Sequence, residues 1–394
     1  MSGEARIEWA AGQMPVVRSI AERFARDRPL DGLRVAACLH VTAETANLVR
    51  ALEAGGAEVD LVASNPLSTQ DDVAETLGVD ARRGDDPAEA IAAAAAANPR
   101  AAIDDGGDLV VALHDAGIPE GFVGATEETT IGLVRLRALA AEGKLACPVL
   151  ALNEAATERA FNDRYGTGQS TLDGILRATN LLLAGRTVVV LGYGYTGRGI
   201  ALRARGAGAW VVVCEVDPLR ALEARMEGYE VLQALDAAEF GDLFITVTGN
   251  RSVLRREHFA RMKDGAVISN AGHFDVEIDL AGLGEAATGP PEDVLPLVQR
   301  YDLGDRRLYL LAGGRVVNLA AAQGHPAEVM DISFALQALA VEWLVTGEET
   351  LEAAVVAVPA EIDREVARLK LEALGVAIDD LTAEQRAYLS SWLR

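Results

Sequence analysis

The stretch from Thr187 to Gly199 constrains the fold of this chain more than any other. Thr187–Leu191 is a short apolar run rich in β-branched residues, which predicts a buried parallel strand. It leads into Gly192, Gly194 and Gly197, spaced as G-x-G-x-x-G. Glycines at these positions let a pyrophosphate approach the backbone at the N-terminus of the next helix. The stretch therefore predicts the strand–turn–helix of a dinucleotide-binding domain.

A second apolar run supports the same interpretation. Trp210–Cys214 ends at Glu215, which lies about 20 positions after the glycine turn, where an acid binds the adenosine ribose. A carboxylate there repels a 2′-phosphate, so the sequence favours NAD over NADP. Arg220 lies nearby and leaves NADP as the alternative. A glycine-rich turn that binds no cofactor is the other alternative.

Composition narrows the class of protein. The chain has 394 residues, of which 50% are hydrophobic, and a formal net charge of −23. Such a chain is globular, with two or three domains, and its charge argues against nucleic acid or an anionic membrane as a partner. Its three cysteines, Cys38, Cys147 and Cys214, lie in apolar segments, which predicts a reduced cytoplasmic protein. No metal-ligand spacing is present, and we expect no catalytic metal.

Short apolar runs alternate with helical patterns along the chain, which predicts an α/β protein with parallel sheets. Arg315–Asn318 is expected to be a late strand, and Asn153–Ser170 a polar connector. Polar loops follow several of the expected strands, where open α/β sheets bind ligands. A single loop acid is more often a helix cap or a solvated charge, and His40, His273 and His325 could be ordinary polar residues at strand ends. The shared position of these loops is what favours a site.

At these loops the chain resembles the adenosylhomocysteinase (S-adenosylhomocysteine hydrolase) family, from about Leu33 to the C-terminus. The motifs that carry the resemblance are HVTAETANLVRALEAGGAEV, SNPLSTQDD, DDGGDL, EETT, FNDRYGTGQSTLDGILRATN, GYGYTGRG, GHFDVEID and VNLAAAQGHP. The YGTGQST wording and the compact length resemble a short, archaeal-type branch. The resemblance implies a Rossmann domain that binds NAD, a discontinuous α/β substrate domain, and a homo-oligomer, usually a tetramer.

The domains expected from this resemblance are given by residue number. They are a substrate-binding domain at 1–165, an NAD-binding Rossmann domain at 166–325, a helix at 326–350 that returns to the substrate domain, and a C-terminal oligomerisation tail at 351–394. The implied substrate is an adenine nucleoside or a small molecule like S-adenosylhomocysteine. In the family reaction, a sugar hydroxyl is oxidised by NAD, the adjacent ring proton is removed, the 5′ substituent is eliminated, water adds, and the ketone is reduced again.

The resemblance also implies site residues. Asp105 matches the acid linked to C4′ proton transfer, and Glu128 matches the acid that holds the ribose hydroxyls. The catalytic positions are His40, Asp105, Glu128, Glu158, Asn162 and His273. The substrate-binding positions are Thr42, Glu44, Asn65, Ser68, Gln70 and His325. The cofactor-binding positions are Thr129, Thr130, Asp163, Gly192, Gly194, Tyr195, Thr196, Gly197, Glu215, Thr248, Asn250, Ala271 and Asn318.

Two of these positions depart from the family motif T-K-x-x-F-D-N. Glu158 stands where the family has its sugar-activating lysine, and Asn162 stands where it has an aspartate. A lysine can take the hydroxyl proton and stabilise the oxyanion, whereas a glutamate stabilises an oxyanion only when it is protonated. Three alternatives stay open: Arg159 partly replaces the lysine, the loop is shifted by one residue, or Glu158 is a surface acid without a role.

Three functions are therefore considered. Because of Glu158 and Asn162, we place first a diverged nucleoside dehydratase of the angustmycin type, which eliminates water to an exocyclic ene. An ordinary adenosylhomocysteinase is the alternative. A non-catalytic NAD-binding homologue is the third, and the retained His40, Asp105, Glu128 and His273 argue against it.

Overall fold

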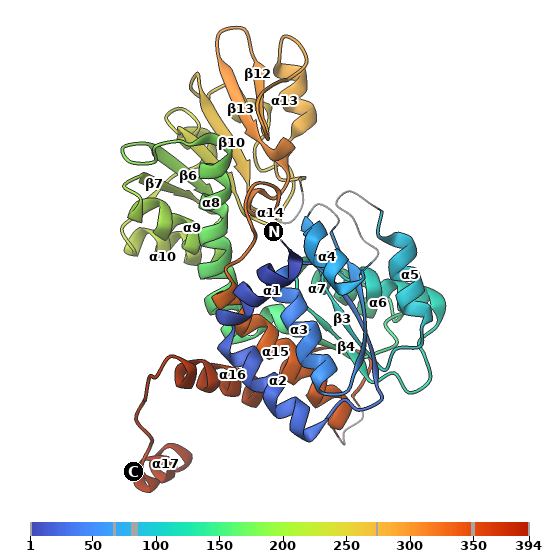
Figure 1. Ribbon diagram of the computed structural model, residues 1–394. Helices are drawn as coiled ribbons and strands as arrows, with labels where there is room; N and C mark the ends of the chain where they lie inside the picture. Colours follow the sequence, from blue (N-terminus) through green and yellow to red (C-terminus); the bar gives the residue numbers. More distant parts are fainter. Residues whose placement is uncertain (1, 66–67, 80–85, 273–274, 348–350, 393–394) are drawn as a thin grey trace.

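The computed structural model describes residues 2–65, 68–79, 86–272, 275–347 and 351–392. Figure 1 shows two lobes, one built mainly from the blue and cyan segments and the other from the green to orange segments. Each lobe is built on one sheet whose central strands are parallel. The predicted α/β class with two parallel-sheet domains is confirmed.

The first lobe contains a six-stranded sheet in the order β14-β5-β4-β3-β1-β2, and all of its pairings are parallel. Its strands are β1 (Arg34–Leu39), β2 (Glu58–Ala63), β3 (Ala101–Asp104), β4 (Gly124–Glu127), β5 (Val149–Ala151) and β14 (Val355–Ala357). Its helices before the second lobe are α1 (Gly3–Gly12), α2 (Pro15–Asp27), α3 (Ala43–Ala54), α4 (Asp71–Leu77), α5 (Ala88–Ala96), α6 (Asp108–Ala116) and α7 (Thr130–Ala141).

The second lobe contains an eight-stranded sheet in the order β11-β12-β13-β10-β9-β6-β7-β8, parallel except around β12. Its strands are β6 (Thr187–Leu191), β7 (Trp210–Cys214), β8 (Glu230–Val231), β9 (Leu243–Thr246), β10 (Ala266–Asn270), β11 (Glu292–Leu295), β12 (Val298–Asp302) and β13 (Arg307–Leu311). Its helices are α8 (Gly168–Thr179), α9 (Tyr195–Gly206), α10 (Pro218–Met226), α11 (Ala234–Ala237), α12 (Arg256–Phe259), α13 (Leu280–Ala286) and α14 (Val317–Ala320).

Helix α15 (Ala327–Thr346) brings the chain back from the second lobe into the core of the first, where it packs on α2 and α3. It is long and apolar enough to cross a membrane, but 67% of its apolar window is buried inside the protein. A helix that is apolar on every side is typical of a protein core. Ser333 and Gln337 interrupt this apolar surface and are buried with it.

The C-terminal segment differs from the tail expected at 351–394. Residues Val355–Ala357 join the first sheet as β14 beside β5. Helix α16 (Ala360–Ala373) buries Ile362 and Val366 in the first core, because apolar residues four apart share one helix face. Only α17 (Ala383–Ser390), with no buried residue, stands away from both lobes in Figure 1.

Two local predictions are wrong. Arg315–Asn318 is not a strand, because Val316 forms only an isolated bridge and α14 begins at Val317. The expected polar connector Asn153–Ser170 contains a π-helix, η3 (Glu158–Thr167), that continues into α8. π-Helices are rare and frequently lie at functional sites.

Candidate functional site

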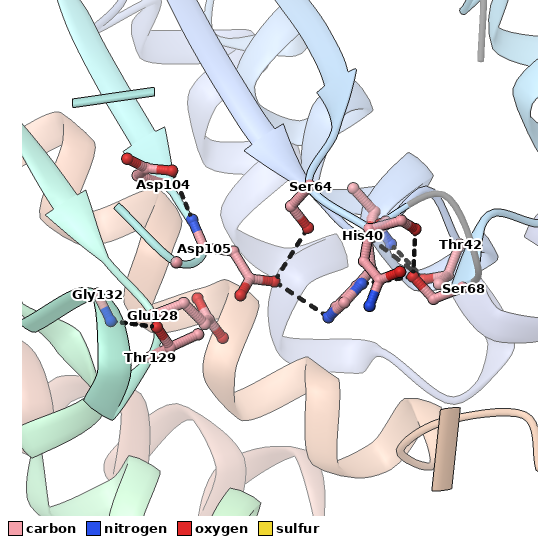
Figure 2. Close-up of polar contacts among 12 residues, drawn as sticks. His40, Thr42, Ser64, Ser68, Asp104, Asp105, Glu128, Thr129 and Gly132 are labelled. Atoms are coloured by element: carbon pink, nitrogen blue, oxygen red, sulfur yellow. Dashed lines mark hydrogen bonds and ion pairs between the residues drawn. The ribbon is translucent and has the colours of Figure 1, made fainter. Parts of the chain in front are cut away.

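Residues that follow three parallel strands meet at the carboxyl edge of the first sheet (Figure 2). His40 follows β1, Asp105 follows β3 and Glu128 follows β4. His40 Nε2 lies 3.3 Å from Asp105 Oδ2, and His40 Nδ1 lies 2.5 Å from Ser68 Oγ. Ser64 Oγ makes a longer contact of 3.5 Å with the same Asp105 oxygen. The structure thus brings His40 and Asp105 together as a candidate acid–base pair.

Asp104 and Glu127, which directly precede Asp105 and Glu128, hold these loops by hydrogen bonds to backbone N–H groups. The sequence did not reveal this role. Asp104 is fully buried and accepts hydrogen bonds from the N–H groups of Asp105 at 3.0 Å and Val110 at 2.7 Å. Glu127 is also fully buried, and its Oε1 accepts the N–H of Gly106 at 2.9 Å. Burial raises the pKa of Asp104 to about 7. The paired acids in IDDGG and TEETT are the signal that could have revealed these supports.

Glu128 is held by α15. Gln337 Nε2 donates a short hydrogen bond to Glu128 Oε2, and Thr126 Oγ1 donates to Gln337 Oε1 at 2.7 Å. Glu128 Oε1 is buried without a hydrogen-bond partner among the described residues. Burial, together with the charge of Asp105, raises the pKa of Glu128 to about 8. A carboxyl in this state suits a ligand hydroxyl, since it can both accept and donate a hydrogen bond.

Glu158 and Asn162 lie on η3 and also contact α15. Ser333 Oγ donates to Glu158 Oε1 at 2.9 Å, and Asn162 Nδ2 donates to Ser333 Oγ at 2.8 Å. Glu158 is only 3% exposed, so the alternative that it is a surface acid is wrong. Burial and the charge of Glu128 raise the pKa of Glu158 well above its ordinary value.

Arg159 does not take the place of the missing lysine in the structure. Its guanidinium lies 3.4 Å from Glu154 and is 40% exposed. The next acid on η3, Asp163, is partly buried, and burial raises its pKa to about 7. Two carboxyl groups, those of Glu158 and Asp163, therefore lie on η3.

The residues expected to bind the substrate organise the loops around the start of α3. Thr42 caps α3 by accepting the N–H of Thr45 at 3.4 Å, and Gln70 Oε1 accepts the N–H of Ala43 at 3.1 Å. Glu44 lies in the first turn of α3, where burial raises its pKa.

Asn65 and His325 are placed by neighbouring hydroxyl groups. Asn65 accepts the hydroxyl of Ser68 through its backbone oxygen at 2.8 Å. His325 Nε2 lies 3.0 Å from Thr167 Oγ1, at the end of η3. Burial and the nearby His40 lower the pKa of His325 to about 4, so its imidazole is neutral at neutral pH. His273 lies outside the described residues.

The glycine turn of the second lobe has the geometry that a dinucleotide requires. Gly192 has φ +110°, and a Cβ on Gly197 would lie 2.1 Å from the Gly192 carbonyl oxygen. Gly194 is the N-cap of α9, so Tyr195 and Thr196 lie in the first turn. Backbone N–H groups in a first turn have no helical acceptor and can bind phosphate oxygens. This turn fits a dinucleotide pyrophosphate.

Glu215 directly follows β7, close to this turn, as the sequence predicted for the ribose-binding acid. Its carboxylate accepts the N–H groups of Tyr193 and Val216, each at 2.7 Å, and of Asp217 at 3.0 Å. These three backbone donors fix the carboxylate at the carboxyl end of the strand.

The loop Thr248–Asn250 is held by an acid to which sequence analysis gave no role. Glu277, which is 1% exposed, accepts the N–H of Thr248 at 2.9 Å and of Gly249 at 2.8 Å, and the Thr248 hydroxyl at 2.8 Å. Asn250 is joined to the same turn through its N–H, 3.0 Å from Thr248 Oγ1. The GHFDVEID motif contains Glu277 and was the available signal.

The remaining positions expected to bind the cofactor come from both lobes. Asn318, on α14, has a buried Oδ1 without a partner among the described residues. Ala271 directly follows β10. In the first lobe, Thr129 caps α7, and Thr130 Oγ1 lies 2.6 Å from Asn153 Oδ1. Asn318 Oδ1 can therefore accept a hydrogen bond from a ligand.

Comparison with known proteins gives matches along the whole chain. Residues 163–324 match the model for S-adenosyl-L-homocysteine hydrolase, NAD binding domain, and residues 1–120 match that for S-adenosyl-L-homocysteine hydrolase. The adenosylhomocysteinase of Aquifex aeolicus (strain VF5) is 56% identical over 402 residues, covering 99% of this chain and 96% of that protein. The adenosylhomocysteinase of Archaeoglobus fulgidus is 54% identical over 402 residues, covering 100% of this chain and 99% of that protein. Among solved structures, the apo form of D-lactate dehydrogenase from Escherichia coli has a TM-score of 0.40 and 17% identity over 64% of this chain and 78% of that one.

Proposed function

Since the chain belongs to the S-adenosyl-L-homocysteine hydrolase family and is an NAD-dependent enzyme, we propose that it hydrolyses S-adenosylhomocysteine to adenosine and homocysteine. This was the alternative in the sequence analysis. The curated adenosylhomocysteinases that match nearly the whole chain support it over the dehydratase. The observation that carries the proposal is the contact of His40 Nε2 with Asp105 Oδ2, beside Glu128.

The acids of the first lobe have distinct roles in this proposal. Asp105 accepts the proton from the sugar carbon next to the oxidised position, and His40 orients its Oδ2 from 3.3 Å away. Glu128 Oε1, which is buried and unpartnered among the described residues, accepts a hydrogen bond from a sugar hydroxyl. His325 lies near His40 and, because burial lowers its pKa to about 4, adds no positive charge beside this pair at neutral pH.

The second lobe matches the NAD-binding domain of the family, and its turn is so tight that a Cβ on Gly197 would lie 2.1 Å from the Gly192 carbonyl oxygen. When bound, NAD supplies the reversible oxidation of the sugar hydroxyl that acidifies the neighbouring C–H bond. The first turn of α9 binds the pyrophosphate, and Glu215 binds the adenosine ribose. Glu277 keeps the Thr248–Asn250 loop in place beside them.

Dehydration is the second candidate, and the burial of Glu158 is the observation that favours it. In this reaction Asp105 takes the proton next to the oxidised carbon, the C–H electron pair forms the C=C bond, the exocyclic C–O bond breaks, and the departing hydroxide takes a proton from an acid; the ketone is then reduced again. Glu158 is buried and its pKa is raised, so it can hold such a proton. A thiolate leaves more readily than hydroxide, so hydrolysis needs this acid less.

Mass spectrometry of products separates the two candidates. The NAD-loaded enzyme is incubated in deuterated water with S-adenosylhomocysteine, and separately with a psicofuranose-type adenine nucleoside. Release of homocysteine supports hydrolysis, whereas loss of one water from the nucleoside without homocysteine release supports dehydration. Asp105→Asn is the inactive control and is expected to lose activity by roughly 10²- to 10⁴-fold. If the enzyme is a dehydratase, Glu158→Lys with Asn162→Asp should raise hydrolysis.

The oligomer is proposed from the family, and the compartment from the family and the cysteines. We infer a homotetramer, as is usual in the family, and a cytoplasmic location, which agrees with three buried free cysteines. Sedimentation equilibrium of the holoenzyme tests the first, and a monomer would contradict it.

A further inference from the structure

One face of α15 contacts both of the acids that sit at the proposed sugar pocket. Ser333 and Gln337 lie four residues apart and therefore project from the same side of the helix. Their side chains are 1% and 0% exposed. Ser333 contacts Glu158 on η3, and Gln337 contacts Glu128 after β4. Polar side chains that are buried in a largely apolar helix need hydrogen-bond partners.

The direction of each hydrogen bond follows from its neighbours. Asn162 Nδ2 donates to Ser333 Oγ, so the single hydroxyl proton of Ser333 goes to Glu158 Oε1. On the next turn, Thr126 Oγ1 donates to Gln337 Oε1, which directs Gln337 Nε2 to Glu128 Oε2. Glu158 is therefore held through Oε1 and Glu128 through Oε2. Each donor, Ser333 or Gln337, is oriented by its own hydrogen bond from a neighbouring side chain.

No lysine of this chain can act in place of Glu158. The sequence contains only Lys144, Lys263 and Lys370. Each one pairs with an acid elsewhere, at 2.7 Å from Glu142, 2.8 Å from Asp242 and 2.7 Å from Asp331, respectively. The hydrogen bond that a lysine ammonium gives in the family motif must come from another donor or be absent.

We propose that Ser333 and Gln337 are positioning residues, which hold Glu158 and Glu128 as a carboxyl pair so that Glu158 donates a hydrogen bond to the sugar hydroxyl in place of lysine. The inference rests on the proposed function, because it needs the sugar in this pocket. Two enclosed carboxyls whose charges repel each other retain at least one proton between them, which supplies the donor. Ser333 orients that donor, because its hydroxyl hydrogen-bonds to Glu158 Oε1 and leaves the proton on Oε2.

The test follows the oxidation of adenosine by the NAD-loaded enzyme, read from the absorbance of reduced nicotinamide. In Ser333→Ala the rate should fall roughly 10- to 100-fold, as for other small displacements of reacting groups, while KM for adenosine changes little. The Ser333 hydrogen bond lowers the pKa of Glu158. Its loss should therefore move the corresponding limb of the pH–rate profile to higher pH.

Matched variants separate positioning from stability. Ser333→Thr keeps the hydroxyl and should restore both the rate and the pH profile. Thr346→Val removes a hydroxyl from the last turn of the same helix, where it only contacts the Glu342 carbonyl, and should change neither. Glu158→Gln combined with Ser333→Ala should be no slower than Glu158→Gln alone, because the two residues act as a unit.

Gln337→Met provides an independent arm should Ser333→Ala fail to fold. It should shift the limb of the pH–rate profile that Glu128 governs to higher pH, since the Gln337 hydrogen bond lowers the pKa of Glu128.

The inference is overturned if the folded variants keep the wild-type rate and pH profile, or if the rate of Ser333→Thr falls as far as that of Ser333→Ala. Wild-type enzyme that releases homocysteine while these variants stay normal contradicts the positioning role alone. Wild-type enzyme that neither oxidises adenosine nor releases homocysteine contradicts the proposed function as well.

Discussion

Glu277 in the second lobe and the pair Glu158 and Glu128 in the first lobe are buried beside loops of the candidate site, but these acids are held in different ways. In the second lobe, Glu277 accepts two backbone N–H groups and a hydroxyl from the loop that it supports. In the first lobe, Glu158 and Glu128 are held by side chains of α15, and burial and the charge of Glu128 raise the pKa of Glu158. Backbone donors fix an acid as part of the scaffold. The single side-chain donor to Glu128 leaves its Oε1 without a partner among the described residues, so that oxygen can bind a ligand group.

Among the substitutions that test this comparison, the largest effect is expected in the second lobe, where backbone geometry shapes the glycine turn. Gly197→Ala places a Cβ 2.1 Å from the Gly192 carbonyl oxygen, so the turn must open where the pyrophosphate binds. We expect NAD affinity to fall roughly 100-fold, about the effect of a 1 Å displacement of a positioned group. Calorimetric titration of the apoenzyme with NAD measures it.

Gly206→Ala is the matched control for this variant, because it adds the same methyl group at the end of α9, with nothing within 4 Å. It should bind NAD as the wild type does. Equal affinity for all three proteins would mean that the close approach at Gly197 does not shape the cofactor site.

A smaller effect is expected at the first lobe, where a distant helix holds η3. Asp363 of α16 accepts the N–H of Ala156 at 2.7 Å and of Thr157 at 3.0 Å, directly before Glu158. Asp363→Ala should lower turnover roughly 10-fold by misplacing Glu158. Loss of these cap-like bonds should also reduce the free energy of unfolding by about 1 kcal/mol.

Steady-state kinetics and chemical denaturation measure both quantities. Glu372→Ala, which removes only an exposed ion pair with Arg368 on the same helix, should change neither. Turnover that is unchanged in Asp363→Ala would show that η3 holds its position without α16.

The last expected effect is on the pH dependence of stability. The pKa of Glu128 is about 8 in the folded protein, above the ordinary 4.5 of an exposed glutamate. A raised folded-state pKa makes stability greatest below the unfolded pKa, and stability is lost as pH rises through this interval. Thermal unfolding should therefore give a lower Tm at pH 8 than at pH 5, by several degrees.

Glu128→Gln and Glu158→Gln should each flatten this slope, because an amide does not titrate. A slope that neither variant changes would place the titrating groups elsewhere, for example at Asp104, whose pKa is raised to about 7.

The sequence predicts the glycine turn of the second lobe better than the surroundings of Glu158 and Glu128, for a physical reason. The turn at Gly192 to Gly197 is local, and its glycines and following acid appear in the chain in the order in which they act. The pocket is assembled from residues far apart in the sequence, and the partners of Glu158 and Glu128 lie on a helix that reads as plain core. The π-helical winding of η3 and the burial of Glu158 depend on that packing, so no local pattern predicted them.

The most direct test of this comparison is a carbon-13 NMR titration of the holoenzyme labelled at glutamate carboxyl carbons, with the Glu158 signal identified by its absence in Glu158→Gln. We predict that Glu158 titrates well above 4.5, because burial and the charge of Glu128 raise its pKa. A Glu158 signal that titrates in the ordinary range near 4.5 would contradict this, and Glu158 could not donate the hydrogen bond that replaces lysine.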